Sequence, residues 1–116
     1  MTDQPDSLTA VQEQTDTDTL QAQEPRILPP YHVVLLDDND HTYDYVVEML
    51  TKLFGHPVEA AFLMACEVDN AKRVVVDTTT KERAEFKRDQ IHAYGADWRL
   101  ERSAGSMSAI IEPVPE

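Results

Sequence analysis

Residues 33–54 read VVLLDDNDHTYDYVVEMLTKLF, and this stretch decides how the rest of the chain is arranged. The apolar run Val33–Leu36 is typical of a short buried strand. The polar residues 37–42 follow it as a loop. Beyond the loop, apolar side chains recur at helical spacing, which predicts an amphipathic helix from about Tyr43 to Phe54. The helical apolar positions are Tyr43, Val46, Val47, Leu50, Leu53 and Phe54.

Local signals mark both ends of this helix. Thr42 is an N-cap residue type, and Asp44 places a negative charge in the first turn, where it suits the helix dipole. Gly55 ends the helix, because glycine readily adopts the left-handed conformation of a C-cap. A strand, an acidic loop and a helix therefore follow one another directly. This order holds three carboxylates, one amide and one imidazole at the edge of a hydrophobic core.

The remaining elements follow from the same signals. A second helix begins at Pro57, which suits a first helical position, and its apolar face is Val58, Ala61, Phe62, Ala65 and Val68. We predict a strand at Val74–Val76, a helix from a capping box at Thr79–Glu82 to about Tyr94, and a strand at Ser106–Glu112. Trp98–Gly105 forms the last connection, with Trp98 expected to pack on the sheet edge.

The order β-α-α-β-α-β predicts an α+β fold, in which a three-stranded antiparallel sheet carries three helices in one layer. Residues 1–29 are expected to be a disordered extension. They are rich in Gln, Thr, Asp and Glu, and cannot bury enough apolar area to offset their chain entropy. Pro29 and Pro30 mark the boundary, so the folded domain is predicted over residues 30–114.

Charge and composition restrict the partners. The 116 residues carry a net charge of −12, which disfavours nucleic acids and favours amines, basic peptides and basic protein surfaces. A single cysteine, Cys66, excludes an internal disulfide, and no apolar run approaches membrane-spanning length. The N-terminus lacks a secretory signal pattern. We expect a cytoplasmic monomer with no metal and no cofactor, because the histidines have no metal-binding spacing.

Three kinds of chemistry use residues like those of the acidic loop. Asp38 and Asp40 before Thr42 match the Asp-x-Asp-x-Thr of haloacid-dehalogenase-like phosphatases, but the chain lacks the further metal ligands and the length of that fold. The same residues resemble the start of an EF-hand loop, yet Tyr43 replaces its glycine and Met49 its final carboxylate. The third possibility is capture of a protonated amine, which needs only crowded carboxylate and carbonyl acceptors beside an apolar pocket.

The same stretch resembles the ClpS family of adaptors for Clp proteases. The family pattern is an apolar strand, then Asn-Asp-Asp, four variable residues, an acid, an aromatic and valine; here it is Leu36-Asp37-Asp38-Asn39-Asp40-His41-Thr42-Tyr43-Asp44-Tyr45-Val46. The similarity extends to Ser106–Pro113 and spans about Pro30 to Pro113. The resemblance implies a non-enzymatic adaptor that binds proteins by a bulky hydrophobic first residue, an N-degron. It implies delivery of those proteins to a Clp unfoldase of the ClpA or ClpC type.

The resemblance also assigns site residues. Those expected to hold the α-amine are Asp37, Asp38, Asn39 and Asp69, and those expected to line the side-chain pocket are His41, Tyr43, Val46, Ala65, Val68 and Met107. Three positions depart from the family pattern. Asp37 replaces an asparagine, Asp69 replaces a histidine, and Lys72 occupies a glycine position. The alternative is therefore a ClpS-like regulator that binds the unfoldase without a working N-degron pocket.

Overall fold

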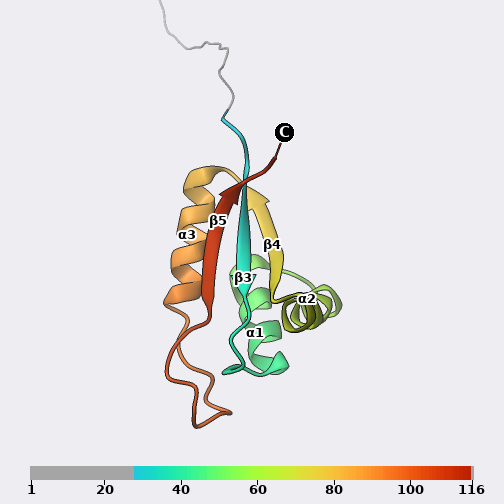
Figure 1. Ribbon diagram of the computed structural model, residues 1–116, viewed down its shortest axis with the longest axis vertical. Helices are drawn as coiled ribbons and strands as arrows, with labels where there is room; N and C mark the ends of the chain where they lie inside the picture. The colour runs from blue at the N-terminus through green and yellow to red at the C-terminus, as the bar shows by residue number, and fades with distance from the viewer. Residues whose placement is uncertain (1–27, 116) are drawn as a thin grey trace, which may run out of the picture.

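The computed structural model describes residues 28–115, in which three helices pack against a three-stranded sheet (Figure 1). In chain order the elements are β3 (Tyr31–Leu36), α1 (Tyr43–Phe54), α2 (Val58–Ala71), β4 (Arg73–Thr79), α3 (Lys81–His92) and β5 (Ser108–Pro113). This arrangement confirms the predicted α+β fold and the predicted order of elements. Residues 1–27, where disorder was predicted, lie outside the described residues, so the boundary at residue 30 stays a prediction.

The sheet brings three chain segments together at one end of its strands. β3 is the central strand and pairs antiparallel with both β4 and β5. Its last residue, Leu36, lies opposite Arg73 at the start of β4 and Ser108 at the start of β5. The acidic loop after β3, the turn before β4 and the residues before β5 therefore meet at the lower end of the sheet in Figure 1.

The core lies between one face of the sheet and the helices. Strand side chains alternate between faces, so every second residue of each strand points to the helices. The fully or nearly buried apolar residues of the packed core are Val33, Leu35, Tyr45, Val46, Met49, Leu50, Ala61, Ala65, Val68, Val74, Val76, Ala84, Ile91, Met107 and Ala109. Four of these, Val46, Ala65, Val68 and Met107, were expected to line a pocket, so the core and the candidate site share side chains.

The cap residues place α1 where the sequence predicted it. The hydroxyl of Thr42 accepts a hydrogen bond from the backbone N–H of Tyr45, and Gly55 adopts φ 73° in the left-handed region. Two other helix starts differ from the prediction. Pro57 is the N-cap of α2 rather than its first residue, and Thr80 rather than Thr79 caps α3. Thr79 is still part of β4, where it pairs with Tyr31.

The strands and the last connection also needed correction. β4 spans seven residues instead of the three predicted, because its pairing with β3 continues to the end of that strand. β5 begins at Ser108, since the side chain of Ser106 instead accepts a hydrogen bond from the N–H of Gly95. α3 ends at His92, before the predicted Tyr94. Trp98 does not pack on the sheet edge: it is 82% exposed.

Candidate functional site

The acidic loop is tied to the turn between α2 and β4. The backbone N–H of Asp37 donates to the carbonyl of Lys72 at 3.1 Å. Lys72 has φ 72°, a left-handed conformation that favours glycine, and it closes α2 by donating its N–H to the carbonyl of Val68. This turn explains why the family pattern has glycine here. It also brings Asp69, in the last turn of α2, close to the loop after β3.

A cavity of about 160 Å³ lies where these segments meet. Its lining comes from the loop after β3, from α1 and α2, and from the residue before β5. The lining residues are Asp37, Asn39, His41, Tyr43, Val46, Ala65, Val68, Asp69 and Met107. Nine of the ten residues singled out in the sequence thus surround one cavity.

Two carboxylates give the cavity its charge. The Asp37 side chain is only 14% exposed, and its Oδ2 lies 3.5 Å from Nζ of Lys72. Asp69 faces it from α2 and accepts a hydrogen bond from the Tyr43 hydroxyl at 2.6 Å. This bond to Asp69 raises the pKa of Tyr43 to about 12. Tyr43 also contacts Phe62 edge-on, with ring centroids 5.8 Å apart, so its ring lies against α2.

Asp38 is the predicted residue that does not line the cavity. Its Oδ1 accepts a hydrogen bond from the N–H of Asp40 and lies 2.9 Å from Nδ1 of His41. The other imidazole nitrogen, Nε2, lies 2.7 Å from the carbonyl of Gly105. With its side chain only 3% exposed, His41 links the acidic loop to the α3–β5 connection. Asp38 therefore contacts the cavity through His41, and direct contact with an amine stays a prediction for it.

The α3–β5 connection, residues 93–107, contributes contacts that the sequence did not predict. Asp97 is buried, and its Oδ2 accepts a hydrogen bond from the N–H of Thr42 at 2.7 Å. Arg102 donates to the carbonyl of Asn39 and to the carboxylate of Asp40. No sequence spacing signals these contacts, because they join residues 55 and 62 or more positions apart.

Asp97 stays ionised in spite of its burial. Burial acts to raise the pKa of this carboxyl, but hydrogen bonds from the backbone N–H groups of Thr42 and Arg99 and from the Arg99 guanidinium outweigh it and hold the pKa at about 2. Arg99 also donates to Glu48 of α1 at 2.8 Å. The start of α1 is thus fixed by a buried anion with several donors.

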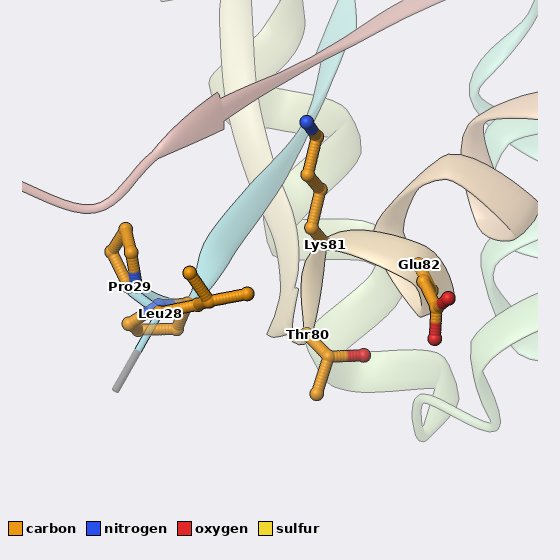
Figure 2. A pocket seen from close by; sticks show the side chains of 6 residues that line it. Leu28, Pro29, Thr80, Lys81 and Glu82 are labelled. Atoms are coloured by element: carbon orange, nitrogen blue, oxygen red, sulfur yellow. The ribbon is translucent and has the colours of Figure 1, made fainter. Parts of the chain in front are cut away.

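A larger hollow, of about 530 Å³, lies at the other end of the sheet (Figure 2). Leu28 and Pro29 form one side of it, and Thr80, Lys81 and Glu82 at the start of α3 form the other. Its six lining residues include one carboxylate and one ammonium group rather than several acceptors. The cavity beside the acidic loop is therefore the better candidate for binding a cationic group.

Comparison with known proteins identifies the family. The sequence model described as "ATP-dependent Clp protease adaptor protein ClpS" matches residues 26–98. The chain belongs to the ClpS family. It is 32% identical over 84 residues to the ClpS adapter of Vibrio cholerae serotype O1, covering 71% of this chain and 79% of that protein. It is 31% identical over 86 residues to ClpS of Hydrogenovibrio crunogenus, covering 72% and 83%.

A solved structure of another ClpS protein has the same fold. Agrobacterium tumefaciens ClpS2, bound to L-phenylalaninamide, superimposes with a TM-score of 0.65 over 74% of this chain and 98% of its own. The sequence identity is 19%, so this likeness concerns the fold alone. ClpS proteins are adaptors of the Clp protease and not enzymes, which sets aside the phosphatase interpretation of the acidic loop.

Among residues 28–115, none of the helices has the length and apolar character needed to span a membrane. The same residues contain no group of three His, Cys, Asp or Glu side chains arranged to hold a metal ion.

Proposed function

We propose that this ClpS-family adaptor binds proteins by their N-terminal residue and delivers them to a Clp AAA+ unfoldase. Asp37 and Asp69, assisted by Asn39, accept hydrogen bonds from the α-amine. The apolar part of the cavity, with Val46, Val68 and Met107 among its residues, receives the first side chain. One observation carries the proposal: two carboxylates and an apolar wall line a single small cavity.

The interaction energies expected for such a complex are large enough for a peptide N-terminus to bind. A peptide α-amine has a pKa of about 7.7–8.0, so it is mostly protonated at pH 7. Each hydrogen bond to a charged group contributes roughly 1.5–3 kcal/mol, and burying one large apolar side chain adds about 1.5–3 kcal/mol. The entropy lost on association offsets part of this gain, which leaves an affinity on the order of micromolar.

The size of the cavity indicates which side chains fit. Its volume of about 160 Å³ compares with roughly 150 Å³ for an engineered apolar cavity that binds benzene. Leucine and phenylalanine side chains match this volume. L-phenylalaninamide, the ligand of the A. tumefaciens structure, carries the same two groups, a free α-amine and a benzyl side chain.

The test removes two of the three acids of the loop. Asp37→Ala combined with Asp38→Ala is expected to weaken binding of a fluorescent Leu-first peptide at least a hundredfold, since about 3 kcal/mol of charge-assisted hydrogen bonding is lost. Fluorescence anisotropy measures the affinity. Glu82→Ala combined with Asp89→Ala removes the same charge from α3, away from the cavity, and should leave binding nearly unchanged. Equal affinity in the wild type and the loop variant would refute the amine site.

One contact favours a second candidate function. The Tyr43 hydroxyl already engages Asp69, in the position where the family pattern has histidine. If that bond keeps Asp69 from the amine, the protein is a regulator that binds the unfoldase without reading N-terminal residues. Such a regulator changes the activity of a Clp ATPase equally with and without Leu-first peptides. An N-degron adaptor instead accelerates degradation of Leu-first substrates over Met-first ones.

A further inference from the structure

Asn39 lines the cavity from a backbone conformation that needs external support. It is one of two non-glycine residues with positive φ among residues 28–115, at φ 68°. Asparagine tolerates this region better than most residues, but the conformation is still less favourable than an extended one. Within the loop, the N–H of Asp40 donates to Oδ1 of Asp38, and further support for Asn39 comes from the α3–β5 connection.

Arg102 supplies that support from outside the cavity. Its Nη2 donates to the carbonyl of Asn39 at 2.7 Å, and its Nε lies 3.2 Å from the same oxygen and 3.2 Å from Oδ1 of Asp40. The guanidinium thus holds the backbone of one loop residue and the side chain of the next. A planar group with several fixed donors suits this double contact, and lysine cannot reproduce it.

Arg102 does not line the cavity, and its side chain is 63% exposed. It therefore has little part in the core, and its replacement should disturb folding only slightly. Arg102 belongs to the α3–β5 connection, which contacts the loop at two further points. Asp97 accepts a hydrogen bond from the N–H of Thr42, and the carbonyl of Gly105 lies 2.7 Å from Nε2 of His41. Arg102 is the one of these three that contacts Asn39.

We propose that Arg102 is a positioning residue for substrate binding: it holds Asn39 in the left-handed conformation that turns the loop acceptors toward the cavity. This inference rests on the proposed function for its effect on peptide affinity. Its effect on the conformation of Asn39 is independent of any substrate.

The sign of the charge effect separates positioning from simple electrostatics. Arg102→Gln removes a positive charge near a site proposed to bind a cation. Through the electric field alone, that change would strengthen binding of an ammonium group. Positioning predicts the opposite, namely a Leu-first peptide affinity weakened about five- to thirtyfold, as expected for a disturbed charge-assisted contact. Arg102→Lys, which keeps the charge but loses the planar group, should also weaken binding.

Two experiments test the positioning role of Arg102. In the first, peptide affinity is measured for Arg102→Gln, for Asn39→Ala and for both together, with Arg88→Gln on α3 as the control for charge. Arg102→Gln should have little further effect once Asn39 is alanine, because alanine lacks the side-chain acceptor that Arg102 is proposed to position. Unchanged or tighter binding in Arg102→Gln, or full additivity with Asn39→Ala, would overturn the inference.

The second experiment uses the free protein. Backbone ¹³C chemical shifts of Asn39 report its φ, and in Arg102→Gln they should move away from left-handed values. Shifts that stay unchanged would overturn the positioning role. If the wild type binds no peptide, the proposed function fails, and the ¹³C shifts still decide whether Arg102 holds Asn39.

Discussion

At the scale of single residues, the Tyr43–Asp69 pair is one place where this chain departs from the family pattern. Asp69 occupies the position of a histidine in that pattern, accepts a hydrogen bond from the Tyr43 hydroxyl, and lines the cavity together with it. A hydroxyl has one proton to give, so it leaves the other carboxylate oxygen lone pairs as acceptors for an amine. Asp69 can therefore take part in amine binding while Tyr43 fixes its direction.

This pairing predicts a measurable pKa. Because the bond to Asp69 stabilises the protonated hydroxyl, the pKa of Tyr43 is raised to about 12. The bond is thus fully present below pH 10 and is lost as the pH rises through about 12. In Asp69→Asn, without the negative charge, the pKa should fall back toward 10. The ¹³Cζ resonance of Tyr43 measures the titration, and an unchanged pKa in Asp69→Asn would show that the two groups do not interact in solution.

At the scale of elements, the turn between α2 and β4 carries strain that can be tested. Lys72 has φ 72°, and a left-handed residue other than glycine costs roughly 1–2 kcal/mol. The free energy of unfolding of Lys72→Gly, measured with urea, should therefore be about 1 kcal/mol higher than that of Lys72→Ala. Both variants remove the ammonium 3.5 Å from Asp37, so both should bind a Leu-first peptide about two- to fivefold more tightly. Equal stabilities would contradict the strain.

The contribution of the α3–β5 connection to stability, through the contacts of Asp97 with the start of α1, depends on pH. The pKa of Asp97 is lowered to about 2 in the folded protein, so its ionised form stabilises the fold above pH 4, and this contribution is lost as the pH falls toward 2. Asp97→Asn should lower the free energy of unfolding by about 1–3 kcal/mol at pH 7. The difference from the wild type should shrink below pH 4. Urea unfolding at pH 2.5, 4 and 7 checks this, and a difference that persists unchanged at pH 2.5 would speak against it.

Elements with local signals could be predicted from the sequence, and those set by distant contacts could not. Both ends of α1 were predicted because Thr42 and Gly55 act on their own neighbours. β4 was predicted too short, because its length depends on pairing with β3 forty residues away in the chain. Trp98 was expected on the sheet edge, but the guanidinium of Arg99 lies 4.6 Å from its ring centroid and the ring stays exposed.

The candidate site divides in the same way. Its lining residues could be predicted because they resemble an ordered family pattern, whereas Asp97 and Arg102 lie in a connection without regular structure. Their contacts with the acidic loop depend on how the chain folds back beside β5. Asp38 lies beside His41 and is not among the lining residues of the cavity, so its contact with the amine stays a prediction.

At the scale of the whole molecule, one end of the sheet brings together the residues of the proposed site. The end of β3 and the starts of β4 and β5 meet there, and each brings part of the cavity lining or its support. A net charge of −12 favours the approach of cationic groups to this end. The described chain begins, and β5 finishes, at the end of the sheet opposite the acidic loop (Figure 1).

The proposed function requires that the cavity recognises an α-amine together with an apolar first side chain. The most direct test titrates the wild-type protein with peptides that differ only in residue one, Leu, Phe, Trp, Met or Glu, each with a free or an acetylated amine. We expect micromolar binding of the free Leu and Phe peptides, weaker binding of the Glu peptide, whose first side chain is not apolar, and loss of all binding on acetylation. Equal affinity across the set, or affinity that survives acetylation, would contradict it.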